Sequence, residues 1–213
     1  MTPLRALIHE PEGISEDTLA PLILFLHGSG ERGDDLARVK WWSPFPYLEA
    51  GHPLPAYVAA PQCALDLFWG DLLDELDRWL DDLLEQYPVD PDRVLLTGFS
   101  MGGFGAWQWA LRRPERFAAL MPIGGNGFHF RNYMMPADLC VLKDLPIWII
   151  HSAGDTVVPV SGADEFHQAL RACGAVFGYT RYPDAGHVET ATAAFADPAH
   201  YDWLLKQKRQ GKA

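Results

Sequence analysis

A serine flanked by glycines is the part of the sequence best suited to covalent chemistry. Residues 98–103 read Gly-Phe-Ser-Met-Gly-Gly, so that Ser100 lies two residues from Gly98 and two from Gly102. An apolar run at 94–97 precedes this segment, and a helix-forming stretch follows it. A serine at such a strand–turn–helix junction is held at strained backbone angles, and glycines on either side remove the clashes. The pattern predicts a nucleophile at Ser100.

A serine hydroxyl needs a base to take its proton, and only the local context distinguishes the eight histidines of the chain. His187 follows the last predicted strand and precedes a helix-forming stretch, and we expect Gly186 to let the loop turn tightly there. These features favour His187 as the general base. His27 and His151 end apolar runs, where a structural role is more common, while His129 and His151 remain alternatives for the base.

The base in turn needs a carboxylate to fix its tautomer and to stabilise the imidazolium. Asp155 lies in the segment Gly-Asp-Thr-Val-Val-Pro, directly after the predicted strand 146–151. It fits the chain order Ser, Asp, His, which favours it as the acid. Asp184 is the alternative, but a residue three positions from His187 on one loop is poorly placed to orient that ring.

A negative charge on an attacked carbonyl oxygen needs two backbone N–H donors. One is expected from Met101, which directly follows the serine, and the other from Ser29 in the glycine-rich segment 27–33. Glycine-rich loops after strands also bind nucleotide phosphates, but this one lacks the G-K-[ST] ending and the G-x-G-x-x-G spacing. We therefore interpret the segment as an oxyanion loop.

The elements that must position these residues alternate along the chain. Short β-rich runs are predicted at 22–27, 56–60, 94–97, 118–123, 146–151 and 177–182, and helices at 71–86, 103–113, 161–173 and 200–209. Several of the runs are continuously apolar, which is typical of strands covered on both faces. The alternation predicts an α/β fold with a mostly parallel sheet between helices. Each candidate site residue falls at a strand's carboxyl end, where such sheets bind ligands.

The length and charge of the chain restrict the kinds of protein it can be. Its 213 residues suit one domain spanning 1–213, and a formal charge of −11 argues against nucleic acid as a partner. Part of the acidity lies on the predicted helix 71–86, where apolar residues recur at helical spacing. We expect the acidic positions between them to form a solvated face: Asp71, Asp74, Glu75, Asp77, Asp81, Asp82 and Glu85.

Cysteine usage and hydropathy bear on the compartment. The three cysteines, Cys63, Cys140 and Cys173, are an odd number without C-x-x-C spacing, so that neither a disulfide framework nor a structural zinc site is expected. No membrane span or signal peptide is apparent, which predicts a cytoplasmic protein. The predicted chemistry requires no metal and no cofactor. Both a monomer and a homodimer are compatible with the sequence.

Two aromatic segments, 33–55 and 124–142, look like neither strand nor helix. Long aromatic loops at the active face of a sheet often line or cover a pocket, and we expect these two to do so. Phe99, Trp69 and Phe128 are the expected substrate-binding residues, from their location in the sequence alone.

With these residues identified, the chain resembles the α/β-hydrolase superfamily. Within it, it is similar to small carboxylesterases related to dienelactone hydrolases and acyl-protein thioesterases, and to a predicted esterase–peptidase subgroup. The motifs that carry the resemblance extend from 26 to 187: His-Gly-Ser-Gly-Glu-Arg-Gly at 27–33, Ala-Pro-Gln at 60–62, Trp69, 98–103, 154–159 and Gly186-His187. The resemblance implies a fold without a large lid domain. Dienelactone hydrolases proper use cysteine as nucleophile, where this chain has Ser100.

The resemblance also implies roles for individual residues: Ser100 as nucleophile, Asp155 as acid, His187 as base, and Ser29 and Met101 as oxyanion donors. The expected reaction is hydrolysis of a small-molecule ester with a short acyl or an aryl group, through an acyl-enzyme. Activity should fall in acid as His187 takes up a proton, and activity that stays flat down to pH 4 would exclude this base. A peptidase or amidase, a thioesterase and a cofactor-free perhydrolase would use the same triad. A non-catalytic hydrolase-fold protein that binds a small ligand is the alternative of another class.

Overall fold

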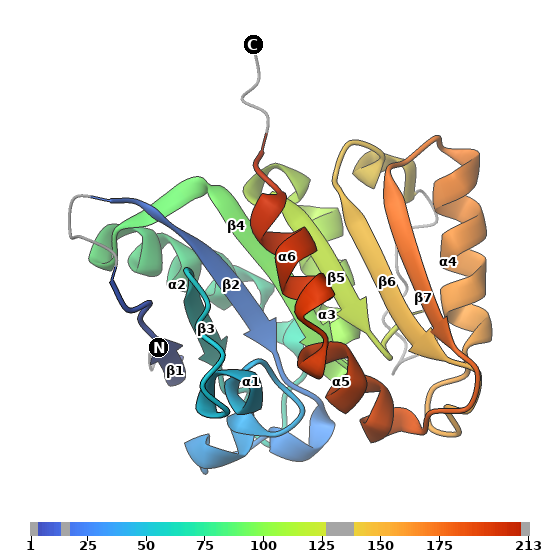
Figure 1. The fold of residues 1–213 in the computed structure, drawn as a ribbon, viewed down its shortest axis with the longest axis horizontal. Helices are drawn as coiled ribbons and strands as arrows, with labels where there is room; N and C mark the ends of the chain where they lie inside the picture. Colours follow the sequence, from blue (N-terminus) through green and yellow to red (C-terminus); the bar gives the residue numbers. More distant parts are fainter. Residues whose placement is uncertain (1–3, 14–17, 127–138, 210–213) are drawn as a thin grey trace.

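The described residues form one seven-stranded sheet with helices on both faces (Figure 1). The computed structural model describes residues 4–13, 18–126 and 139–209. The strand order is β1-β3-β2-β4-β5-β6-β7, and β1 runs antiparallel to β3 while the other neighbouring pairs are parallel. The strands are β1 Ala6–His9, β2 Ala20–Leu26, β3 Tyr57–Pro61, β4 Val89–Phe99, β5 Ala119–Ile123, β6 Ile147–Ser152 and β7 Phe177–Tyr182. The predicted α/β fold with a mostly parallel sheet is confirmed.

The apolar strands separate two layers of core. Alternate residues of β2 point to opposite faces, so that Leu22 and Leu24 belong to one buried cluster and Ile23 and Phe25 to the other. All seven residues of β2 are buried. A strand buried on both faces needs apolar side chains at successive positions, which explains why these runs lack the alternation of a half-exposed strand.

The helices divide between these two faces. Those with residues in the first cluster are α2 Leu73–Gln86, α3 Met101–Arg112 and α4 Ser161–Ala172, and those with residues in the second are α1 Phe45–Glu49, α5 His187–Ala196 and α6 Pro198–Lys206. Short 3₁₀ turns connect them: η1 Ser29–Glu31, η2 Leu36–Lys40, η3 Trp69–Leu72, η4 Pro114–Arg116 and η5 Leu139–Leu142. None of the helices in the described part of the chain is long and apolar enough to cross a membrane.

The acidic face of α2 is not solvated throughout, which corrects one expectation. Asp77 is 8% exposed, and its carboxylate accepts hydrogen bonds from Trp109 Nε1 at 2.8 Å and from Arg113 Nε at 3.0 Å. Asp81 pairs with Arg116 at 2.6 Å. Because α2 packs beside α3 and η4, part of its acidic face meets their basic side chains. The helical periodicity alone could not reveal this neighbour.

A disulfide joins Cys140 of η5 to Cys173, the residue after α4, with Cα atoms 5.3 Å apart. The expectation that the cysteines form no disulfide is wrong for this pair. The two residues are 33 positions apart in the sequence, and only the packing of η5 against α4 in one core cluster brings them together. Cys63 remains a free, buried thiol, and burial raises its pKa to about 12.

Candidate active site

Ser100 sits at a strained turn between β4 and α3. Its φ of 54° and ψ of −117° place a non-glycine residue in the left-handed half of backbone space, which is costly and is typical of functional sites. A Cβ on Gly98 would come within 2.3 Å of the Gly102 carbonyl oxygen, and a Cβ on Gly102 within 1.8 Å of the Leu26 carbonyl oxygen. Both glycines are therefore required by close backbone contacts, as the motif predicts.

The register of the sheet brings the glycine-rich loop beside the serine. Leu26, the last residue of β2, pairs with Gly98 in β4, so that the segments after both strands emerge side by side. A Cβ on Gly28 would lie 3.5 Å from Ser100 Cβ, which shows how closely the two loops approach. Met101 opens α3 and Ser29 opens η1, positions at which a backbone N–H has no acceptor within its own helix. Both amides thus begin helical turns next to Ser100.

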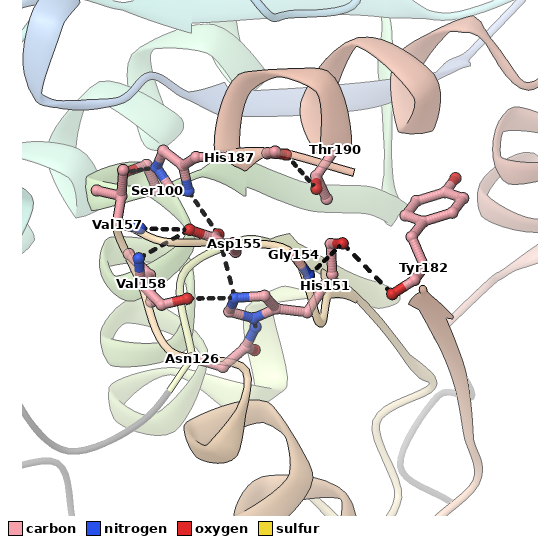
Figure 2. Close-up of polar contacts among 12 residues, drawn as sticks. Ser100, Asn126, His151, Gly154, Asp155, Val157, Val158, Tyr182, His187 and Thr190 are labelled. Carbon is pink, nitrogen blue, oxygen red and sulfur yellow. Dashed lines mark hydrogen bonds and ion pairs between the residues drawn. The ribbon is translucent and has the colours of Figure 1, made fainter. Parts of the chain in front are cut away.

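A chain of hydrogen bonds joins the three residues singled out from the sequence (Figure 2). His187 Nε2 lies 2.8 Å from Ser100 Oγ, and His187 Nδ1 lies 2.6 Å from Asp155 Oδ2. Because a carboxylate only accepts, the Nδ1 proton is donated to Asp155, and Nε2 is left with a lone pair that faces the serine hydroxyl. Ser100 follows β4, Asp155 follows β6 and His187 begins α5, five residues after β7.

The carboxylate of Asp155 is buried and surrounded by donors. Burial opposes its ionisation, but hydrogen bonds from His151, His187, Val158 and Val157 outweigh that cost and hold its pKa well below the ordinary range. The Val157 and Val158 amides donate to Oδ1 at 2.9 and 2.8 Å. Asp155 is therefore a fixed negative charge that orients His187. Asp184, the alternative acid, is exposed.

His27 supports the glycine-rich loop rather than the chemistry. Its Nδ1 donates to the Gly28 carbonyl at 2.6 Å, its Nε2 accepts from the Cys63 amide at 3.0 Å, and the Trp69 indole donates to its carbonyl at 2.9 Å. Gln62 Nε2 reaches the same loop and donates to the Glu31 carbonyl. Three residues from separate motifs thus stabilise the loop beside Ser100: His27, Gln62 and Trp69.

The titration of His27 predicts a pH dependence of stability. Burial lowers its pKa to about 4 in the folded protein, against about 6.5 in an unfolded chain. As the pH falls from 6.5 towards 4, His27 therefore takes up a proton in the unfolded state before it does so in the folded state. The contribution of His27 to the free energy of unfolding, which is fully present above pH 6.5, is progressively lost over this range. Between pH 7 and 5 we expect this residue to reduce the free energy of unfolding by about 2 kcal/mol. Urea titrations at pH 7 and pH 5 measure this loss of unfolding free energy in the native protein and in His27→Asn, which keeps a donor but does not titrate. Equal losses of unfolding free energy in the two proteins would contradict this prediction.

Glu31 is a second buried ionisable group in the loop. It is 1% exposed, and its Oε2 has no hydrogen-bond partner among the described residues. Burial raises its pKa, while hydrogen bonds from the Gly28 and Glu31 amides oppose that shift. The carboxyl group thus anchors the backbone of the loop that adjoins Ser100.

The expected substrate-binding residues have different outcomes. Trp69 is fully buried and packs against Gly105. A Cβ added to Gly105 would lie 2.4 Å from the Trp69 Cβ. The expectation that Trp69 lines the substrate pocket is therefore wrong. Phe99 is 3% exposed, and its ring lies 4.7 Å from the His187 ring. Phe128, the alternative base His129 and most of the aromatic segment 124–142 lie outside the described residues.

Gly186 also differs from its expected role. Its φ of −68° and ψ of 177° are ordinary extended backbone at the N-cap of α5, which any residue can adopt. A Cβ there would meet only the flexible end of the Glu189 side chain. The helix start, and not a glycine turn, places the His187 ring.

The segment 33–55 lines a pocket, but not one that contains the triad residues. A cavity of about 670 Å³ lies between this segment and α5, and it is bordered by Trp41, Trp42, Tyr47, Thr192, Phe195 and Ala196, among others. Ser100, Asp155 and His187 are not among the described residues around it. Trp42 connects the two regions, since its ring lies 6.3 Å from that of Phe99.

A buried polar chain behind Asp155 escaped the sequence analysis. Trp107 Nε1 donates to Asn126 Oδ1 at 2.6 Å, and Asn126 Nδ2 lies 3.2 Å from His151 Nδ1. His151 Nε2 lies 3.0 Å from the Val158 carbonyl and 3.3 Å from Asp155 Oδ2 (Figure 2). The only signal in the sequence was that His151 ends an apolar strand four residues before Asp155; nothing pointed to Asn126.

The fold, with a strained serine at the end of a central strand, an aspartate after β6 and a histidine after β7, defines an α/β hydrolase. The chain belongs to the phospholipase/carboxylesterase family, whose model matches residues 69–195. The matched region includes Ser100, Asp155 and His187.

Individual relatives and solved structures resemble the chain. A Salmonella typhi protein named as a carboxymethylenebutenolidase is 32% identical over 104 residues, which are 48% of this chain and 38% of that relative's length. The crystal structure of a thermostable esterase superposes with a TM-score of 0.82 at 29% identity, over 96% of this chain and 59% of that one. An acylaminoacyl peptidase of Pyrococcus horikoshii shares the fold, with a TM-score of 0.71 at 17% identity, over 99% of this chain and 41% of that one.

Proposed function

We propose that the chain is a serine carboxylesterase that cleaves esters with a short acyl or an aryl group through an acyl-enzyme. The observation that carries the proposal is the continuous hydrogen-bonded chain from Ser100 Oγ through His187 to the buried Asp155. The names of the relatives, a carboxymethylenebutenolidase and an esterase, support an ester as the substrate class.

The first half of the reaction follows from this geometry. His187 Nε2 removes the Ser100 proton while the oxygen attacks the ester carbonyl carbon, and the new oxyanion accepts hydrogen bonds from the Ser29 and Met101 amides. Asp155 stabilises the imidazolium that forms. When the tetrahedral intermediate collapses, the bond to the alcohol oxygen breaks, and Nε2–H protonates that oxygen as it leaves.

The second half uses the same groups in reverse. Water gives a proton to His187 Nε2 and attacks the acyl carbon, and the bond to Ser100 Oγ breaks as His187 returns the proton to it. The step consumes one water and releases the carboxylic acid.

Hydrolysis of p-nitrophenyl esters from acetate to palmitate tests the proposal. We expect turnover of at least one member, with p-nitrophenol released at a rate proportional to enzyme concentration. Parallel panels of peptides and acyl thioesters distinguish the peptidase and thioesterase alternatives, since these differ in leaving group and not in nucleophile. A protein inert toward all three panels would contradict catalysis and favour a small-ligand binder.

We further propose that residues 1–213 act as one domain, since the described helices with residues in the two core clusters all pack against one sheet. A cytoplasmic location is a separate proposal, made from the sequence. The Cys140–Cys173 disulfide counts against this location, because disulfides persist mainly in oxidising compartments.

A further inference from the structure

The pocket between the segment 33–55 and α5 is suited to an uncharged apolar group. None of the described residues that line it is Asp, Glu, Lys or Arg, and its walls include the rings of Trp41, Trp42, Tyr47 and Phe195. Its volume of about 670 Å³ falls in the range of small-molecule sites.

Two of the hydroxyl groups at the pocket wall are already engaged. Ser43 Oγ donates to the Lys40 carbonyl at 2.6 Å, and Thr192 Oγ1 donates to the Val188 carbonyl at 3.0 Å. A ligand there gains mainly apolar contact, and a charged ligand would lose its hydration without a counter-charge.

The walls of the pocket are preformed. The Tyr47 ring is held between His52, at 4.6 Å, and Tyr201, at 4.5 Å. Trp42 adopts a φ of 47°, a left-handed conformation that is costly for a bulky residue and is typical of ligand-binding segments. The surroundings therefore hold Trp42 in a strained conformation at the border of the pocket.

The same two elements connect the pocket to the reacting centre. Trp42 contacts Phe99, whose ring lies against His187. The helix α5 begins at His187 and carries Thr192 and Ala196 to the pocket, five and nine residues later. At a rise of 1.5 Å per residue, these positions lie about 8 and 14 Å along the helix axis from the base.

We propose that this pocket binds the apolar end of the ester whose carbonyl reacts at Ser100. The inference rests on the proposed function and adds a size to one side of the ester: either the acyl or the alcohol side is an alkyl or aryl group that extends about 10 Å from the carbonyl. An acetyl group is too short to reach the pocket, whereas an octyl or octanoyl chain reaches it.

Two matched variants on α5 test the proposal. Ala196 and Ala193 are both exposed alanines of the same helix, but only Ala196 lines the pocket. We expect Ala196→Phe to raise KM at least tenfold for p-nitrophenyl octanoate or octyl acetate, according to which side of the ester enters. KM for ethyl acetate, whose two ends are both too short to reach the pocket, should stay within twofold, and Ala193→Phe should leave all three values unchanged. Equal effects of both variants, or no effect of Ala196→Phe on either octyl substrate, would overturn the proposal.

A binding experiment separates this inference from the proposed function. Fluorescence titration with 1-naphthol should show binding to Ser100→Ala, and Ala196→Phe in that background should weaken it at least tenfold while Ala193→Phe does not. If no ester is hydrolysed but this pattern holds, the pocket stands and the esterase proposal fails. Equal naphthol affinity in all three proteins overturns the pocket.

A second inference rests on the buried chain behind Asp155. Trp107 can only donate, so Asn126 Oδ1 is its acceptor, and the Asn126 amide NH₂ must then face His151 Nδ1. That leaves the proton of the neutral His151 ring on Nε2, where it faces Asp155 and the Val158 carbonyl. The three residues of the chain are buried: Trp107, Asn126 and His151.

The structure assigns His151 as a positioning residue for Asp155. Its Nε2–H approaches the same oxygen that accepts from His187, and it also fixes Val158, whose amide donates to the other carboxylate oxygen. The link through Asn126 to Trp107 ties this carboxylate to α3, the helix that begins after Ser100.

Two substitutions at His151 distinguish positioning from general stability. Gln places an amide N–H near the position of Nε2, whereas Leu has no donor. We expect His151→Leu to lower kcat roughly 10- to 100-fold with little change in KM. Its acid limb of kcat/KM should move to higher pH, because a carboxylate with fewer donors holds the His187 proton more strongly. Asp155 contacts His187 directly, and Glu31 interacts with it electrostatically.

The conservative variant decides the outcome. His151→Gln should recover most of kcat and the native acid limb, while both variants unfold at temperatures that are measured separately. Equal kcat values in two folded variants, or an acid limb that does not move in His151→Leu, would overturn the assignment.

Discussion

Replacing Ser100 with alanine is expected to lower kcat for ester hydrolysis about 10⁶-fold without unfolding the protein. The variant keeps His187, Asp155 and the loop amides but loses the atom that becomes acylated, so only transition-state binding remains. Among the described residues the hydroxyl makes one hydrogen bond, to His187, and its loss therefore removes little of the packing. Initial rates on p-nitrophenyl acetate measure the effect.

Asp155→Asn provides an intermediate case. An amide at this position would present an NH₂ to the His187 ring and favour the wrong tautomer, which typically costs about 10⁴ in kcat. Ser161→Ala, at an exposed serine that begins α4, serves as the matched control and should retain native activity. If Ser100→Ala hydrolysed the ester about as fast as the Ser161→Ala control, Ser100 would not be the nucleophile.

Gly102→Ala is expected to have the largest effect on folding. The added Cβ would lie 1.8 Å from the Leu26 carbonyl oxygen and 2.7 Å from that of His27, and neither backbone atom can move without disturbing β2 or the loop after it. Such overpacking should destabilise the protein by more than about 3 kcal/mol. Urea unfolding followed by circular dichroism measures this change.

Gly30→Ala is the control for that prediction. A Cβ on Gly30 would meet nothing within 4 Å, and we expect its free energy of unfolding to stay within about 0.5 kcal/mol of the native value. Similar stabilities of the two variants would mean that β2 and the turn at Ser100 do not pack as described.

Local patterns made the serine turn and the strands predictable. The contacts that require Gly98 and Gly102 arise within a few residues of Ser100 and from one neighbouring strand, so the motif carries most of the information. All seven residues of β2 and the last six of β4 are buried, and most of them are apolar because both faces of the sheet are covered there. By contrast, β1 has four half-buried residues at the sheet edge and no distinctive pattern.

Features set by distant packing were not predictable from the sequence. Trp69 lies in a motif after a strand, yet it is buried because Gly105 of α3 leaves room for its ring. Asp77 looked like its exposed neighbours on α2 until α3 placed Trp109 against it. Cys140 and Cys173 meet only because η5 and α4 pack together. Each case depends on which element lies opposite, which spacing within one element does not encode.

The most direct test of the central claim is labelling with a fluorophosphonate, followed by peptide mass mapping. A serine activated by His187 attacks the phosphorus and expels fluoride, which leaves a stable adduct. We predict one adduct on the native protein, located on Ser100, and none on Ser100→Ala. A native protein that stays unlabelled, or one labelled at another residue, would contradict the assignment of Ser100 as the nucleophile.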